Sequence, residues 1–235
     1  MNHEPVISII LPVFNEATVI AATLSQFAVN SEVEIIVVDG ASSDRTLEIV
    51  ELFSANNAQI KLVVAEEKGR AQQMNYGAEL ARGKILLFLH ADTQLPNNYQ
   101  KIIEQIIQDR KPVLGAFKLA IAGQEVGLRV IERLVNWRSR IFSLPYGDQA
   151  FFLTQENFQK LGGFPDLPIM EDFELVKQAK KQGKIAIASV AVITSARRWQ
   201  KLGIWQTTLI NQIVIVGYYF KVPLEKLRSL YGYFA

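Results

Sequence analysis

The stretch ILLFLHADTQLP, residues 85–96, is an apolar run that ends abruptly on polar side chains. Residues 85–89 are rich in Ile, Leu and Phe and are too few for a helix of usual length, so they predict a buried strand. His90 and Asp92 follow directly, and Pro96 comes soon after. A buried strand that stops on an imidazole and a carboxylate indicates a sheet edge that faces a charged ligand.

Three more apolar runs precede this one, at residues 6–11, 34–38 and 61–65. Helical periodicity fills the intervals, at residues 17–27, 44–53 and 70–81, and Gly83 is expected to cap the last helix. Strands that alternate with helices predict an α/β fold with a mostly parallel central sheet and helices on both faces. In such folds ligands bind beyond the carboxyl ends of the strands.

The second half of the chain has a mixed pattern. It predicts strands at 113–121, 150–154 and 185–193 and helices at 127–141 and 172–182. Neither a repeat nor a linker is evident, so residues 1–235 are expected to form a single domain whose helical tail begins at about residue 200.

The apolar segment 204–220 is interrupted by Gln, Thr and Asn side chains and falls short of about 20 clean apolar residues. It predicts an amphipathic helix that packs on the core or on a partner. The alternative is a helix that rests on a membrane surface.

Composition excludes several classes of function. The chain has 235 residues and 49% hydrophobic content, enough for a large core, and its 25 basic and 23 acidic residues argue against a general nucleic-acid binder. Cysteine is absent, which excludes disulfides, zinc–thiolate sites and thiol nucleophiles. The first apolar run is interrupted by Ser8 and stopped by Pro12, so no signal peptide is expected. The predicted location is cytoplasmic, with peripheral attachment to the inner face of the membrane as the alternative.

Polar side chains gather at the ends of the predicted strands: Asn15 and Glu16 after the first, Asp39 after the second, residues 66–70 after the third, and His90 and Asp92 after the fourth. One crevice is expected to collect them. The turn after the first strand, LPVFNE, lacks the GxGxxG of dinucleotide-binding folds, and no Walker loop is present. If the crevice binds a nucleotide, a divalent cation held by Asp92 is the economical way to hold its phosphates.

Seven segments, in order from about residue 7 to residue 199, resemble motifs of the family 2 glycosyltransferases: LPVFNE, VVDGASSDRT, GRAQQMNYGAELARG, LLFLHADT, YGDQAFF, GGFPDLPIMEDFEL and TSARRW. Among these enzymes the segments look most like the bacterial subgroup named for its association with radical-SAM and selenium-related domains. The resemblance implies a GT-A fold, a nucleotide-diphosphate sugar donor, a divalent metal (Mn²⁺ or Mg²⁺) and inversion at the anomeric carbon. It does not name the base, the sugar, the acceptor or the oligomeric state.

The resemblance also implies roles for individual residues. Asp172 would be the base that takes the proton from the acceptor hydroxyl, and Asp92, with His90 beside it, would hold the metal. Asp39 would pair with the nucleobase. The nucleotide-sugar site would comprise Pro12, Phe14, Glu16, Asp39, Lys68, Arg70 and Ala91. Contacts with the donor phosphates or the acceptor would come from Gly147, Asp148, Gln149, Glu171, Arg197, Arg198 and Trp199.

Two departures from the broad family pattern bear on the metal. His90 stands where the first Asp of an Asp-X-Asp motif usually is, and Gly40 stands where a second Asp often follows Asp39. A neutral imidazole is a softer ligand than a carboxylate, so the site is expected to hold Mg²⁺ less firmly and to tolerate Mn²⁺ better.

Plainer interpretations remain open at this point. Asp172 would serve as a helix cap, Asp39 as a turn opener and His90 as a hydrogen-bonding group at a strand end. Residues 147–149 would form a hairpin turn, residues 68–70 a solvated loop, and residues 197–199 an exposed basic pair beside a packed indole.

Two classes of function follow. The first is an inverting glycosyltransferase, and the second is a nucleotide-sugar-binding regulatory or assembly protein without turnover. Retention of both Asp92 and Asp172 favours the first. A nucleotidyltransferase is disfavoured because no glycine-rich phosphate loop follows the first strand.

Overall fold

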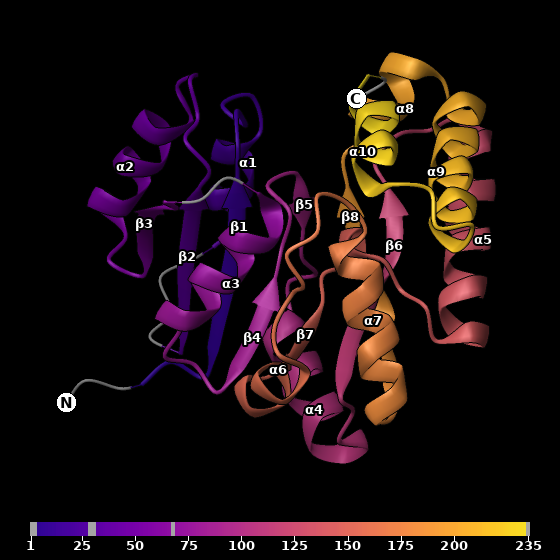
Figure 1. Ribbon diagram of the computed structural model, residues 1–235. Coiled ribbons are helices and arrows are strands. Elements are labelled where there is room, and N and C mark those ends of the chain that lie inside the picture. The colour runs from indigo at the N-terminus through magenta and orange to yellow at the C-terminus, as the bar shows by residue number, and fades with distance from the viewer. Residues whose placement is uncertain (1–3, 28–31, 67–68, 234–235) are drawn as a thin grey trace.

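The computed structural model describes residues 4–27, 32–66 and 69–233. Within these ranges the chain is an α/β protein built on one eight-stranded sheet with strand order β3-β2-β1-β4-β7-β6-β8-β5 (Figure 1). The strands are β1 (Ile7–Val13), β2 (Val33–Asp39), β3 (Ile60–Val64), β4 (Ile85–Phe88), β5 (Thr93–Gln94), β6 (Leu114–Ile121), β7 (Phe152–Thr154) and β8 (Ile185–Thr194). The helices are α1 (Ile20–Ser25), α2 (Thr46–Asn56), α3 (Arg70–Leu80), α4 (Tyr99–Arg110), α5 (Val126–Phe142), α6 (Gln155–Leu161), α7 (Glu171–Gln182), α8 (Arg197–Leu202), α9 (Ile204–Tyr219) and α10 (Leu224–Tyr233), with a 3-10 turn, η1 (Gly147–Gln149).

The first half of the sheet is parallel, as the alternating pattern predicts. β2 and β4 flank β1 in parallel register, with Ile10 opposite Ile36 on one side and Phe88 on the other, and β3 continues the parallel order beyond β2. Every residue of β1 and β2 is buried. Runs of Val, Ile and Leu suit these strands because helices cover both of their faces.

The second half corrects the expectation of a mostly parallel sheet. β7 runs antiparallel to both β4 and β6, β5 runs antiparallel to β8, and only β6 and β8 pair in parallel. The cause lies in η1, whose Gly147 lies beside His90 just beyond β4. The chain therefore enters β7 at the edge where β4 ends and must run back along it. The sheet is mixed.

Two buried clusters confirm that helices cover both faces of the sheet. Alternate residues of β1 point to opposite clusters, Ile9 to one and Ile10 to the other. The Ile9 cluster takes side chains from α1, α2 and α4, namely Ile20, Leu24, Val50, Ile103 and Ile106. The Ile10 cluster takes side chains from α3, α6 and α7, namely Met74, Ala78, Phe158, Leu161, Leu175, Val176 and Ala179.

The predicted helical cap Gly83 has another role. α3 ends at Leu80 with Ala81 as its C-cap, so Gly83 lies beyond the helix. A Cβ atom on Gly83 would lie 2.7 Å from the backbone nitrogen of Ser8, closer than packed atoms approach. The glycine is needed because two backbone segments meet there.

A buried carboxylate fastens the amino ends of the strands. Glu34 accepts hydrogen bonds from the Ser8 hydroxyl at 2.7 Å, the Arg82 backbone N–H at 2.6 Å and the Lys61 ammonium at 2.9 Å. Burial alone raises the pKa of this carboxyl, but the three donors outweigh it and lower the pKa to about 2. Glu34 therefore stays ionised inside the protein.

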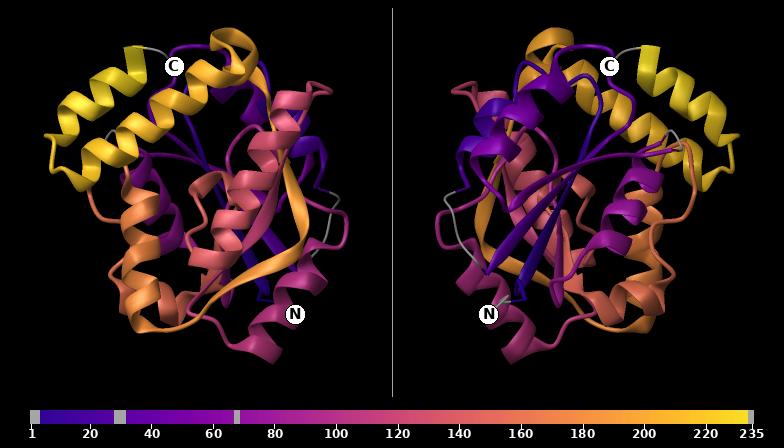
Figure 2. Two further views of the ribbon diagram at one scale, coloured as in Figure 1. Left: turned by 90° about the vertical axis from the view of Figure 1, so that its right-hand side faces the viewer. Right: turned by 90° about the vertical axis from the view of Figure 1, so that its left-hand side faces the viewer.

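The tail folds back against the domain. α9 forms over the segment predicted to be an amphipathic helix, and its Val214 packs with Phe173 of α7 and Leu227 of α10. α5 packs Leu128 and Ile131 against β6. Figure 2 shows α5 and α9 on the same side of the molecule, and no helix among the described residues is long and apolar enough to cross a membrane.

Candidate active site

The loops after β1 and β2 interlock to form one rim of the site. Asn15 has a left-handed backbone (φ 54°), and its Oδ1 accepts the N–H groups of Ser43 at 2.8 Å and Asp44 at 3.3 Å. The N–H of Glu16 donates to the hydroxyl of Thr46 at 2.8 Å. These bonds fix the rim while the Phe14 ring stays 55% exposed, which is unusual for a large apolar side chain next to a buried strand.

A cavity of about 340 Å³ opens between this rim and the start of α3; we call it the β1–α3 cavity. Asp39 is fully buried at the end of β2, next to the lining residue Gly40. Its Oδ2 accepts the N–H of Ser42 at 2.8 Å, whereas its Oδ1 has no hydrogen-bond partner among the described residues. A buried carboxylate oxygen left unpaired is costly and is suited to an N–H of a ligand. The cavity is lined by Pro12, Val13, Phe14, Glu16, Gly40, Gly69, Arg70, Gln73 and Arg228.

Gln73 explains why Gly40 follows Asp39. The Gln73 amide is buried and donates to the carbonyls of Val13 at 2.8 Å and Val38 at 2.7 Å, so it joins the ends of β1 and β2. A Cβ atom at Gly40 would lie 3.0 Å from this amide. A second Asp at this position would therefore push against the clamp that holds the two strand ends.

Arg197 joins the predicted metal site to the rim. Its Nη2 lies 3.2 Å from Oδ2 of Asp92 and 2.9 Å from Oε2 of Glu16, although it stands at the start of α8, more than 100 residues away in the sequence. Burial raises the pKa of Glu16, although the charge of Arg197 opposes that shift. Ala91 is buried, and its carbonyl accepts the hydroxyl of Thr23. Arg197, predicted to contact the donor phosphates or the acceptor, thus lies at the strand ends.

Asp172 and His90 converge on Gly147. Asp172 is the second residue of α7, and Met170 before it has a left-handed backbone (φ 71°) that turns the chain into the helix. Its Oδ2 accepts the Gly147 N–H at 2.8 Å, and its Oδ1 accepts the Phe173 N–H at 2.7 Å. A Cβ atom on Gly147 would lie 3.0 Å from Oδ2 of Asp172 and 3.3 Å from Nε2 of His90, so only glycine leaves both side chains in place.

His90 is uncharged at neutral pH. Burial lowers the pKa of its imidazole to about 4, and the positive charge of Arg70 acts in the same direction. The carboxylates of Asp92 and Asp172 both lie within electrostatic range of His90 and oppose that shift. The two carboxylates predicted to hold a metal and to accept a proton therefore both lie near His90.

A second cavity, of about 160 Å³, lies between α7 and α9; we call it the α7–α9 cavity. Burial raises the pKa of Asp148 to about 6, and its Oδ1 has no hydrogen-bond partner within the described ranges. The guanidinium of Arg138 stacks 3.5 Å from the Tyr146 ring and fixes that wall. The cavity is lined by Arg70, His90, Tyr146, Asp148, Ile169, Met170, Asp172, Phe173, Asn211, Val214, Ile215 and Tyr231.

Arg70 lines both cavities. Its Nε donates to Oε1 of the buried Glu171 at 2.5 Å, while 44% of its side chain remains exposed. Glu171 thus anchors a cation between the two cavities, and an anion that spans them would meet it.

Other predicted residues lie apart from the cavities. Gln149 is fully buried: it donates to the Phe117 carbonyl at 2.8 Å and accepts from the Ser139 hydroxyl at 2.8 Å. The Gln149 side chain therefore holds the η1 loop in place and lines neither cavity, whereas the sequence predicted a contact with donor or acceptor. The Arg198 guanidinium stacks 3.6 Å from the Tyr231 ring, and the half-buried Trp199 packs beside the α5–β6 cluster. Lys68 lies outside the described residues.

The described residues provide only part of the ligand set that a bound metal ion needs. Among the described residues no group of three or more His, Asp or Glu side chains could hold an ion. Mn²⁺ and Mg²⁺ are often held by one or two protein ligands completed by substrate phosphates, and Asp92 with the neutral His90 fits that pattern. Arg197, which now pairs with Asp92, would have to share or leave that carboxylate.

Sequence reasoning missed Gln73, Tyr146, Asn211, Arg228 and Tyr231. Gln73 left a signal, because it is a polar side chain on the face of α3 that buries Met74, Gly77 and Ala78. The residues of α9 and α10 left none, since their approach to the cavities depends on how the tail folds back.

Comparison with known proteins decides the family. Residues 8–159 match the family model Glycosyl transferase family 2. The chain belongs to this family. This membership covers β1 to most of α6 and so includes the loops of the β1–α3 cavity, His90 and Asp92. The radical-SAM and selenium-related subgroup remains a prediction.

Curated relatives of this glycosyl transferase family 2 protein are distant or partial. It is 27% identical over 227 residues to the probable glycosyltransferase YdaM of Bacillus subtilis (strain 168). The aligned region covers 87% of this chain and 54% of YdaM. It is 38% identical over 94 residues to a PGL/p-HBAD biosynthesis glycosyltransferase of Mycobacterium bovis (strain BCG / Pasteur 1173P2). That aligned region covers 39% of this chain and 37% of the relative. The chain thus spans about half of YdaM and less of the mycobacterial protein.

Solved structures show the same fold. The mannosyltransferase PcManGT from Pyrobaculum calidifontis, in complex with GDP-Man and Mn²⁺, superposes with a TM-score of 0.68 at 19% identity and covers 99% of this chain and 70% of its own. S. aureus TarS 1-349, in complex with UDP-GlcNAc, gives a TM-score of 0.66 at 19% identity and covers 97% and 71%. This likeness supports the GT-A fold expected from the sequence, with a mixed sheet.

Proposed function

We propose that this chain is an inverting glycosyltransferase that moves a sugar from a nucleotide-diphosphate sugar to an acceptor hydroxyl. The observation that carries the proposal is the continuity of the site: Arg70 lines both the β1–α3 cavity, where Gly40 next to Asp39 is also a lining residue, and the α7–α9 cavity, which Asp172 lines too. The donor would occupy the first cavity with its base at Asp39 and its diphosphate toward Arg70 and Arg197. The acceptor would enter the second.

In the reaction, the acceptor oxygen attacks the anomeric carbon while the bond from that carbon to the diphosphate breaks. The hydroxyl proton passes to a carboxylate oxygen of Asp172, which the Gly147 N–H orients. Negative charge grows on the departing nucleoside diphosphate, and fixed cations aimed at it lower the barrier. A Mn²⁺ or Mg²⁺ ion held by Asp92 and the donor phosphates would add to that positive charge.

A thermal-shift screen of nucleotide sugars tests the donor site. UDP-GlcNAc and GDP-Man, the ligands of the solved relatives, are the first donors to screen, with and without Mn²⁺. A donor at 100 times its Kd is expected to stabilise the native protein by about 2.7 kcal/mol and so to raise Tm. The Asp39→Ala variant is expected to lose that shift, whereas Asp172→Asn keeps it.

The screen also separates the alternatives. If no nucleotide or nucleotide sugar raises Tm under either condition, the donor site is wrong. If donors bind but no nucleoside diphosphate is ever released, the chain is the binding protein without turnover. The cytoplasmic location remains a prediction.

A further inference from the structure

Two adjacent helices present large apolar side chains to solvent, and we call their outer surface the α5–α9 face. On α5 the exposed side chains recur at helical spacing along one side, opposite Leu128 and Ile131, which pack on β6. On α9 they lie opposite Ile210 and Val214, which are buried. The α5 set comprises Val126, Val130, Leu134, Trp137 and Ile141, and the α9 set comprises Trp205, Leu209, Ile213 and Val216, with Phe220 directly after the helix.

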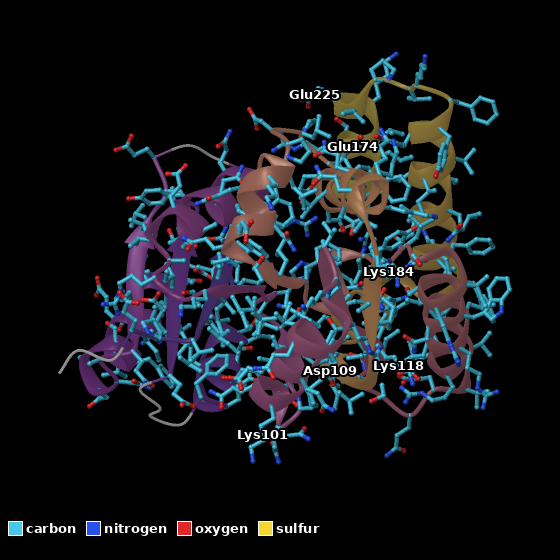
Figure 3. All side chains as sticks on the ribbon, turned by 90° about the horizontal axis from the view of Figure 1, so that it is seen from below. Lys101, Asp109, Lys118, Glu174, Lys184 and Glu225 are labelled. Carbon is cyan, nitrogen blue, oxygen red and sulfur yellow. The ribbon has the colours of Figure 1, made fainter. Side chains whose placement is uncertain are left out.

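The two helices form a single surface. A Cβ atom on Gly127, in the first turn of α5, would lie 2.9 Å from Cδ1 of Ile204, the first residue of α9, so the helices meet closely there. Both lie on the side that faces the viewer in the left panel of Figure 2, and their ribbons lie together at the right of Figure 3. An apolar area of this extent on a protein surface is typical of an interaction site.

The charges around this face are one-sided. The whole chain is nearly balanced, with 25 basic and 23 acidic residues. Residues 126–142 and 197–221 include this face and hold four exposed Lys and Arg side chains besides Arg197, which pairs with Glu16 and Asp92. Their one acidic residue, Glu132, is part-buried and pairs with Arg129 at 3.0 Å. A second copy of the chain that presented the same face would meet like charges, whereas an anionic surface would be attracted. The four exposed basic residues are Arg133, Arg140, Lys201 and Lys221.

We propose that the α5–α9 face binds the surface of an anionic lipid bilayer, with both helices lying in the plane of the interface. Helices that lie on membranes combine an apolar face with Lys and Arg at its borders, and Trp favours the level of the headgroups. Trp137 and Trp205, two of the three Trp residues of the chain, are 58% and 67% exposed on this face. The face thus supplies apolar contact and charge attraction together.

This orientation has a consequence for the substrate, which rests on the proposed function. The inner side of α9 supplies Asn211, Val214 and Ile215 to the α7–α9 cavity. A helix is about 10 Å across, so a bilayer on the outer side lies one helix away from Asp172. The acceptor class that fits this geometry is a hydroxyl compound carried by the membrane.

Vesicle sedimentation tests the binding. The full chain is expected to sediment with vesicles of phosphatidylcholine and phosphatidylglycerol, to bind phosphatidylcholine alone far less, and to be released by salt. Leu209→Glu should weaken binding at least about tenfold, because it removes apolar contact and adds a negative charge. Leu52→Glu is the matched control: Leu52 is 65% exposed and Leu209 60%, and α2 lies on the opposite side of the molecule (Figure 1).

The outcomes distinguish this proposal from its rivals. Absence of binding to anionic vesicles, equal loss in both variants, or a dimer in solution that Leu209→Glu dissociates without any vesicle binding would each overturn it. The donor-induced rise in Tm is measured on the same variants, because Leu209→Glu should leave it unchanged. Vesicle binding without any donor response would overturn the proposed function alone and leave the membrane face standing.

Discussion

Gly147 is the residue on which the proposed base depends, since its N–H holds Asp172 and its missing side chain makes room for His90. We expect Gly147→Ala to displace one or both side chains and to lower turnover by at least about tenfold, because misplacement on the scale of an ångström costs reactions heavily. The backbone there needs no glycine conformation, so Tm should change little. Assays of nucleoside diphosphate release measure the turnover, and thermal melts measure Tm. Unchanged turnover would contradict the assigned geometry.

Glu34 lies near the amino end of β2, away from the candidate site, so we expect it to affect stability rather than catalysis. We expect Glu34→Gln to lower the free energy of unfolding at pH 7 by about 2 kcal/mol, since the buried carboxylate loses its charge-assisted hydrogen bonds. The pKa of Glu34 lies below its ordinary value of 4.5, at about 2, so the ionised carboxylate stabilises the fold above pH 4.5. That contribution is lost as the pH falls toward 2.

Urea titrations of wild type and variant between pH 2 and pH 7 check the Glu34 prediction. The matched control is Glu48→Gln, because Glu48 pairs with Arg45 at 2.9 Å on an exposed surface, where ion pairs contribute little to stability. A difference between wild type and Glu34→Gln that does not shrink toward pH 2 would contradict the assigned network.

At the scale of the element, α3 does more than cover the sheet. Gln73 clamps the carbonyls at the ends of β1 and β2, so Gln73→Leu should destabilise the fold by about 2 kcal/mol through the loss of two buried hydrogen bonds. It should also weaken donor binding, because both strand ends border the β1–α3 cavity. Gln72→Leu, one residue earlier on the same helix, is the control, and equal effects in the two variants would exclude the clamp.

The sequence predicted elements well where apolar runs were long. The ends of the four strands in the parallel half were predicted to within two residues, because short runs of Val, Ile and Leu are typical of buried strands. α4 was missed although Ile103 and Ile106 give it a buried side, and β5 was missed because two residues carry no periodicity. α1 begins at Ile20, later than predicted, because the preceding residues form the turn held by Thr46.

At the scale of the whole molecule, strand direction was the property that the sequence could not give. Apolar alternation is the same whichever way a strand runs, so the antiparallel β7 depended on where η1 returns the chain. Two of the polar side chains expected to gather at the strand ends, Glu16 and Asp92, do lie together, since Arg197 pairs with both. The contribution of α9 and α10 to the cavities arises only from tertiary packing.

The central claim is that Asp172 takes the proton while Asp39 and Arg70 hold the donor. Its most direct test measures nucleoside diphosphate release and donor Kd for wild type and Asp172→Asn. We predict that release falls by about 10²- to 10⁴-fold, the usual contribution of a general base, while Kd stays within about threefold. Turnover close to that of wild type, or loss of donor binding with the fold intact, would contradict this account.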